Sequence, residues 1–173
     1  MAYRIGMRFL NHLPALAFVF ALCCAASARA ADVTFVRVWP GYRTAGSFER
    51  ISEYLTGQEN TGGQTVLRSQ PARRAGFYFL VRLKNSGGSV AGAIFELSVV
   101  TPASATPRLL TFVADLPTDG HVFECGLTGT DWPDAKTYPV AWKLIIRTPG
   151  GAEIASTQSF MWAKPDAAAD APK

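Results

Sequence analysis

The chain contains few side chains that could form a catalytic or metal-binding set. Beyond the N-terminal segment described below, His121 and Cys125 are the only histidine and cysteine. They have the same parity on one expected strand, but four residues at about 3.3 Å each place them roughly 13 Å apart. A cysteine nucleophile with a histidine base must share a hydrogen bond, so this pair is not expected to react. The sequence predicts no metal site and no cofactor.

Acidic residues gather in two places where carboxylates could act as a pair. Asp131 and Asp134 share one loop, and Glu49, Glu53 and Glu59 lie in a charged stretch. Glycoside hydrolysis needs two carboxylates within about 5 to 10 Å. Calcium also binds loop carboxylates, but this spacing matches no established calcium loop. Acidic loop residues are ordinarily solvated or cap nearby backbone, so a small carboxylate-dependent hydrolase is the weaker alternative function.

Tryptophan and arginine side chains give a more specific indication of a binding surface. Three tryptophans lie at strand ends or in loops, where an exposed ring could stack on a sugar or anchor a protein. The segment 42–74 is rich in arginine, which makes bidentate and stacked contacts. Packing of the tryptophans into the core and a salt-bridged flank over a sheet edge are the structural alternatives. The candidate binding residues are Trp39, Trp132, Trp162, Arg43, Arg50, Arg68, Arg73 and Arg74.

The N-terminal segment has the features of a cleavable signal peptide. Arg4 and Arg8 precede an uncharged apolar run over residues 13–26, and Ala28 and Ala30 fit the small-residue pattern that precedes a cleavage site. The run is shorter than the roughly 20 residues of a membrane-spanning helix, and the residues before its two cysteines fit a lipid-attachment pattern poorly. We expect cleavage after Ala30 and export to a periplasm or the extracellular medium, with no membrane span left.

Removal of this segment changes the charge balance of the chain. The whole sequence has a formal net charge of +4, but three arginines leave with the signal peptide, and the remainder is nearly neutral. A nucleic-acid partner is therefore not expected. The expected organisation is a signal peptide at 1–30, one domain at 31–163 and a disordered tail at 164–173, which has no large apolar residue.

Alternating apolar residues predict a series of short strands. In the clearest of them, residues 76–84, Phe77, Phe79, Val81 and Leu83 share one face. Turns rich in glycine and proline separate the other runs, which are expected at 32–39, 64–68, 92–100, 108–116, 121–127, 138–148 and 153–162. Cys125 alternates with apolar neighbours in one of these runs, so it is expected to be buried.

Three shorter segments carry expectations of their own. Pro40-Gly41 is expected to end the first strand. Residues 85–88, Asn-Ser-Gly-Gly, have the composition of a hairpin loop. Residues 47–55 fit a short helical or irregular element slightly better than a strand, because Phe48, Ile51 and Leu55 have helical spacing.

Seven to eight short antiparallel strands without a long amphipathic helix predict an all-β sandwich. Over residues 32–163 this rhythm resembles the immunoglobulin or fibronectin type III architecture. The resemblance extends to architecture only, because Cys125 has no partner for the Cys, Trp, Cys spacing of true immunoglobulin domains. The sequence therefore predicts an exported, non-catalytic β-sandwich domain that binds a protein or a cell-envelope component. A carbohydrate-binding module that uses an exposed tryptophan is the alternative.

Overall fold

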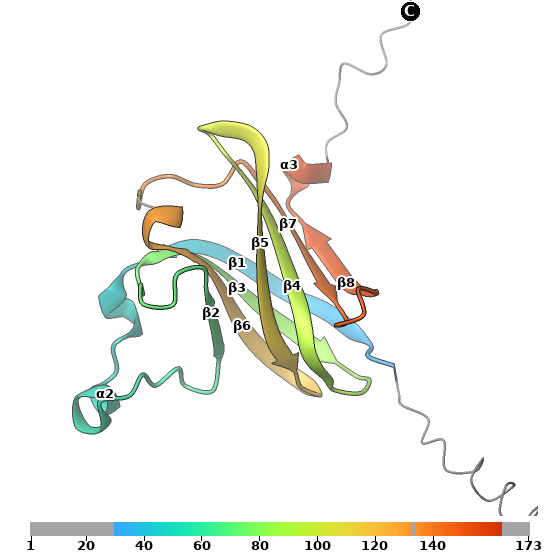
Figure 1. Cartoon of the computed structure of the whole chain (residues 1–173), viewed down its shortest axis with the longest axis horizontal. Coiled ribbons are helices and arrows are strands. Elements are labelled where there is room, and N and C mark those ends of the chain that lie inside the picture. Colours follow the sequence, from blue (N-terminus) through green and yellow to red (C-terminus); the bar gives the residue numbers. More distant parts are fainter. Residues whose placement is uncertain (1–29, 133, 164–173) are drawn as a thin grey trace, which may run out of the picture.

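Two four-stranded sheets face each other in the computed structural model, which describes residues 30–132 and 134–163 (Figure 1). The first sheet has the order β1 (Val33–Arg43), β3 (Gly76–Asn85), β6 (Asp119–Thr128), β2 (Thr65–Arg68). The second has the order β5 (Ser104–Leu116), β4 (Val90–Thr101), β7 (Ala141–Arg147), β8 (Glu153–Gln158). The expected all-β sandwich is confirmed. Most of the expected signal peptide and the expected C-terminal tail lie outside the described residues.

Short helical elements lie at three places along the chain, two of them between strands and one after the last strand. η1 (Ala45–Phe48) and α2 (Ile51–Thr56) lie between β1 and β2, which confirms the short helical element expected near 47–55. η2 (Gly129–Asp131) follows β6. α3 (Phe160–Ala163) follows β8, so the expectation of a strand up to residue 162 is wrong at its end.

The alternating faces of the strands form the core between the sheets. Phe77, Phe79 and Val81 on β3 are fully buried, because β3 lies between β1 and β6 and faces the second sheet. The rings of Phe95 on β4 and Phe123 on β6 meet across the interface with centroids 4.7 Å apart. The expected inward faces of these strands are thus confirmed, and their burial supplies the main driving force for folding.

β1 continues beyond the point where Pro40 was expected to end it. Pro40 lies opposite Phe79 in the register, and the strand runs to Arg43. A proline cannot donate a backbone hydrogen bond, but it is tolerated where its nitrogen faces the free edge of a sheet. β1 is such an edge strand, which explains why the proline does not stop it.

The expected hairpin at residues 85–88 is wrong, because β3 and β4 belong to different sheets. The buried Asn85 organises this crossing: its amide donates to the carbonyl oxygens of Gly88 and Pro117, both at 3.0 Å. Its side-chain oxygen accepts from the backbone N–H of Gly87 at 3.0 Å. A Cβ at Gly87 would come within 2.1 Å of the carbonyl oxygen of Ala30, so the close approach of these segments requires glycine.

β2 departs from the expected antiparallel pattern. It pairs with β6 in parallel, with Thr65 opposite Phe123 and Arg68 opposite Gly126. A hairpin would force antiparallel pairing, whereas a long connection allows either direction. β2 is reached through residues 44–64, called the excursion below, and this length permits the parallel entry.

Candidate functional site

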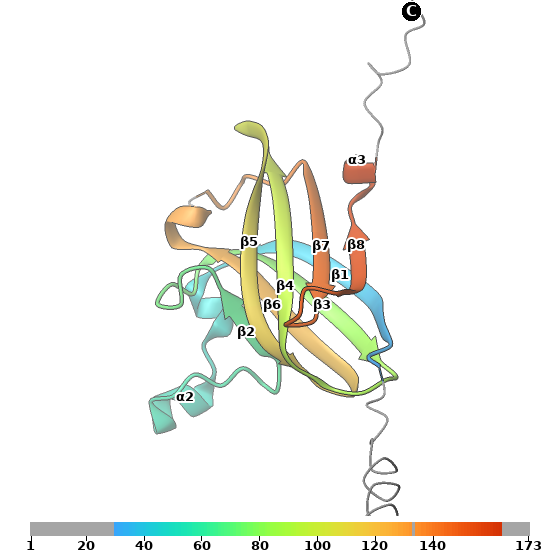
Figure 2. The ribbon, with the colours of Figure 1, turned by 45° about the vertical axis from the view of Figure 1, so that its right-hand side comes forward.

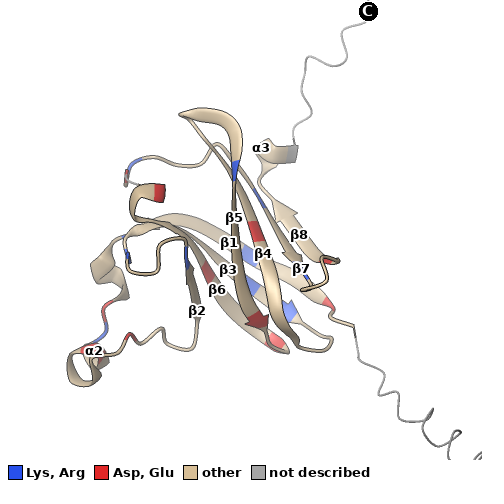
Figure 3. Ribbon diagram, in the orientation of Figure 1, with Lys and Arg blue, Asp and Glu red and all other residues tan. Residues whose placement is uncertain are grey.

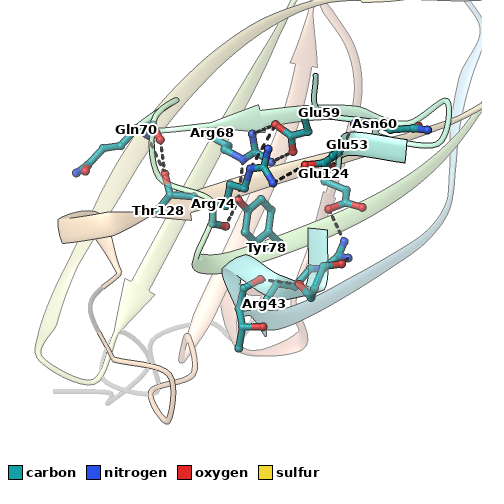
Figure 4. Close-up of polar contacts among 12 residues, drawn as sticks. Arg43, Glu53, Glu59, Asn60, Arg68, Gln70, Arg74, Tyr78, Glu124 and Thr128 are labelled. Carbon is teal, nitrogen blue, oxygen red and sulfur yellow. Dashed lines mark hydrogen bonds and ion pairs between the residues drawn. The ribbon is translucent and has the colours of Figure 1, made fainter. Parts of the chain in front are cut away.

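The excursion leaves the sandwich after β1 and carries α2 away from both sheets (Figures 1 and 2). Ion pairs with arginines of the following segment hold it in place (Figure 4). An isolated helix of six residues is not stable in water, so these tertiary contacts determine its position.

Arg68 at the end of β2 is the centre of this network. Its guanidinium binds both carboxylate oxygens of Glu59, with one N–O distance of 2.8 Å, and its Nε donates to the hydroxyl of Tyr78 at 3.1 Å. The hydrogen bond with Arg68 holds the pKa of Glu59 below its ordinary value, and the same bond raises the pKa of Arg68. The pair remains charged at neutral pH and ties the excursion to the first sheet.

Tyr78 and Arg74 extend the network toward α2. The Tyr78 hydroxyl donates to the backbone carbonyl oxygen of Arg74 at 2.6 Å, and burial raises the pKa of Tyr78, so the hydroxyl keeps its proton. The Arg74 guanidinium lies 2.8 Å from the carboxylate of Glu53 on α2 and 3.8 Å from that of Glu59. The pKa of Arg74 is raised by its hydrogen bond with Glu53.

Arg43 fixes the start of the excursion. Its guanidinium lies 2.6 Å from the buried carboxylate of Glu124 on β6, and it stacks over the Phe48 ring at 4.1 Å. The Phe48 ring also packs on Tyr78, with centroids 4.9 Å apart. Arg43, Arg68 and Arg74 are thus structural anchors.

The two remaining candidate arginines, Arg50 and Arg73, are exposed. Their side chains form no ion pair with another described residue, although the Arg50 guanidinium lies beside Gly62. These two are available to a partner, whereas the anchoring arginines are occupied. The structure therefore divides the five arginines of segment 42–74 into two groups, which their spacing in the sequence could not separate.

α2 presents its apolar side chains to solvent. Ile51, Tyr54 and Leu55 are 84%, 80% and 84% exposed, although their spacing places them on one helical face. The half-buried polar side chains Ser52 and Glu53 face the rest of the protein instead. This is the reverse of the usual amphipathic arrangement, in which the apolar side packs on the core.

Local hydrogen bonds explain why the polar face of α2 points inward. Gly57 adopts a left-handed conformation with φ of 68° and donates its N–H to the carbonyl of Glu53 at 2.8 Å, which ends the helix. Asn60 donates its amide to the Ser52 hydroxyl at 2.9 Å and its backbone N–H to the Glu53 carboxylate at 3.3 Å. The polar side chains of Ser52 and Glu53 are thus engaged within the excursion and, through the Glu53–Arg74 ion pair, with the segment after β2, which leaves the apolar face outward.

The three candidate tryptophans have different environments. Trp132 is only 4% exposed and packs on Phe77 with centroids 4.8 Å apart, so it fills the core and offers no open ring face. Its indole N–H has no partner among the described residues. Trp162 in α3 is half-buried. Trp39 is 39% exposed, with the Arg37 guanidinium 4.5 Å from its ring centre.

The loop carboxylates are engaged with neighbours. Asp131 pairs with Arg108. Burial raises the pKa of Asp131, but hydrogen bonds from Ser69 and Arg108 outweigh this and leave it below its ordinary value. Asp134 accepts from the Thr137 hydroxyl at 2.6 Å and from the backbone N–H of Lys136 at 2.9 Å, which lowers its pKa. Both carboxyls are ionised at neutral pH, so neither is suited to donate a proton there.

His121 and Cys125 occupy separate environments on β6. The His121 Nε2 lies 2.8 Å from the Thr65 hydroxyl, and burial lowers its pKa. Cys125 is fully buried as expected, and burial raises the pKa of its thiol to about 12, so it is not a reactive thiolate. In the described ranges, no three His, Cys, Asp or Glu side chains come together to hold a metal ion.

Comparison with known proteins adds no identification, since no family model and no curated protein matches the chain. Within the part of the chain that the structure describes, no helix is both long and apolar enough to cross a membrane.

Sequence reasoning did not identify the outward face of α2 as a candidate site. The helical spacing of Phe48, Ile51 and Leu55 suggests a common inward face, but only Phe48 is buried. The outward orientation could have been suspected from the polar residues Ser52 and Glu53, followed by Asn60. Their hydrogen bonds direct the polar face of the helix inward.

Proposed function

We propose that this protein is an exported, non-catalytic domain of the immunoglobulin-like class that binds another protein through α2. The strand order supports this class. If β1, β3 and β6 are strands A, B and E, and β4, β7 and β8 are strands C, F and G, every neighbour agrees with the immunoglobulin pattern. β2 then lies at the position of strand D but in parallel, and β5 is added beside strand C.

The observation that carries the binding proposal is the inverted orientation of α2. Ile51, Tyr54 and Leu55 expose most of their apolar surface, while one ion pair, Glu53 with Arg74, holds the polar side of the helix against the protein. Exposed apolar groups that lie together on one face mark interaction sites more often than scattered ones do. A partner that covers this face would remove apolar surface from water.

Charge next to α2 favours a protein partner over a lipid surface. Arg50 and Glu49 are both exposed beside the helix, so the rim of the patch carries both signs. Binding to an anionic membrane surface would instead require a cluster of basic residues. A hydrophobic centre with a mixed polar rim is the usual composition of a protein interface.

Affinity capture tests this proposal. The immobilised protein is exposed to an envelope extract of the producing cell, beside an Ile51→Glu/Leu55→Glu variant and a Phe160→Glu control, which changes an equally exposed apolar residue on α3. We expect wild type and control to retain the same partner and the α2 variant to lose at least nine tenths of it. Equal retention by all three proteins would contradict a binding role for α2.

A carbohydrate-binding role through Trp39 is the second candidate, because Trp39 is the candidate tryptophan whose ring is most open in the described structure. A sugar stacked on this ring would change the tryptophan fluorescence, and Trp39→Ala would remove the response. A panel of purified polysaccharides, applied to the wild type, the Trp39→Ala variant and the Ile51→Glu/Leu55→Glu variant, separates the two functions.

A further inference from the structure

Strand β5 leaves one edge of the second sheet unpaired. It pairs with β4 alone, and among the described residues no backbone hydrogen bond joins it to another element. A strand paired on one side uses only half of its backbone groups. Every second residue of β5 therefore directs its N–H and C=O away from the sheet.

The middle of this edge lacks the features that normally protect an edge strand. Between Arg108 and Asp115, residues 109–114 contain no charge, no proline and no glycine, and Figure 3 shows this part of β5 free of charged residues. Leu109 and Val113 are 60% and 64% exposed on its outer face. Edges of this composition pair readily with other chains unless something covers them.

Three hollows follow one another along β5, and each is lined by residues of both sheets. The first, about 400 Å³, lies between Arg108 and Trp132. The second, about 320 Å³, lies between Phe112 and Leu67, and the third, about 360 Å³, lies between Leu116 and His121. They therefore form the open seam of the sandwich, beside the unpaired edge.

An added strand would pair with the β5 edge and place side chains in the hollows of the seam. Its backbone would satisfy the free N–H and C=O groups of β5, and every second side chain would point toward the layer where the hollows lie. We propose that the β5 edge binds an extended segment of another polypeptide by strand addition, with large apolar side chains of that segment in the seam hollows.

The structure favours a separate polypeptide over the other occupants. In a second copy of this protein, the inward side chains of β5, such as Leu110 and Phe112, already lie in its own core and could not enter the hollows. Residues 164–173 contain no apolar side chain large enough to fill them. Sugars and lipids lack the alternating donors and acceptors that pair with a strand edge.

A displayed library of random twelve-residue peptides, selected on the purified protein, tests this inference independently of α2. We expect the selected peptides to carry large apolar residues at alternate positions. The Thr111→Lys/Val113→Lys variant, which changes outward side chains only, should bind them at least tenfold more weakly, since lysine on an edge opposes strand addition. The matched Leu55→Lys variant on α2 should bind them as the wild type does.

The peptide backbone supplies the second readout. Two forms of each selected peptide are prepared, one N-methylated at its odd-numbered residues and one at its even-numbered residues. One of the two forms should lose binding, because its methyl groups replace the N–H hydrogens that face β5. The proposal is overturned if no selected peptide depends on the β5 side chains, or if neither N-methylated form binds more weakly than the unmodified peptide. It is also overturned if wild type forms a dimer that Thr111→Lys/Val113→Lys abolishes, or if removal of residues 164–173 accelerates amide exchange in β5.

Discussion

Phe79→Ala is expected to lower the free energy of unfolding by about 3 to 5 kcal/mol. Phe79 is fully buried at the centre of β3, and its ring packs on Phe77 and Trp142 with centroid distances of 5.6 Å and 5.5 Å. Its removal leaves a cavity between the sheets that the surrounding rings cannot fill without losing their own contacts. Urea unfolding monitored by circular dichroism measures the loss.

Phe79→Leu is the matched control for this experiment, because it keeps an apolar side chain at the same position. We expect it to cost about 1 to 2 kcal/mol, clearly less than the alanine variant. If Phe79→Ala unfolds within 1 kcal/mol of the wild type, the inward face of β3 does not form the core described above.

Arg68→Met is expected to destabilise the protein by about 2 to 3 kcal/mol, because it leaves the Glu59 carboxylate and the Tyr78 hydroxyl without their shared partner. Methionine keeps much of the apolar volume of the arginine stem, so the loss reports mainly on the charged contacts. Arg73→Met serves as the control, since the Arg73 side chain is exposed and makes no ion pair with a described residue. Its stability should equal that of the wild type.

Acid should reduce the difference between wild type and Arg68→Met. The pKa of Glu59 is held below its ordinary value of 4.5 by Arg68, so this stabilisation is complete above about pH 4.5 and is lost as the pH falls through the lowered pKa. The two unfolding free energies should therefore converge between pH 5 and pH 2. A constant difference over this interval would show that Arg68 acts through packing alone.

The central strands could be predicted from the sequence because burial on one face imposes a period of two. Alternate residues from Phe77 to Leu83 and from Phe95 to Val99 are apolar, and the structure buries them, although Tyr78 on the other face of β3 is buried as well. The burial of Cys125 could be predicted for the same reason, since it alternates with apolar residues on β6 and shares their inward face.

The features that depend on distant partners could not be predicted in this way. The direction of β2 is set by pairing with β6 after a long connection, and Pro40 is tolerated only because β1 lies at an edge. The orientation of α2 depends on an ion pair between Glu53 and Arg74, 21 residues apart. Local periodicity contains no information on any of these contacts.

The candidate site shows the same division. The arginine content of segment 42–74 marks it as a candidate binding surface. In the structure, however, Arg43, Arg68 and Arg74 anchor this segment, and the exposed surface that they support is the apolar face of α2. Trp132 could be placed in the loop at residues 128–136 from the sequence, but not inside the core, because that depends on contact with Phe77 on β3.

Amide exchange of the protein with and without its captured partner tests the role of α2 most directly. The proposal predicts that the partner slows exchange at residues 51–57, where the Gly57 N–H bonds to the Glu53 carbonyl, and that the Ile51→Glu/Leu55→Glu variant shows no such slowing. Slower exchange confined to other elements, with residues 51–57 unchanged, would contradict the assignment of α2 as the binding surface.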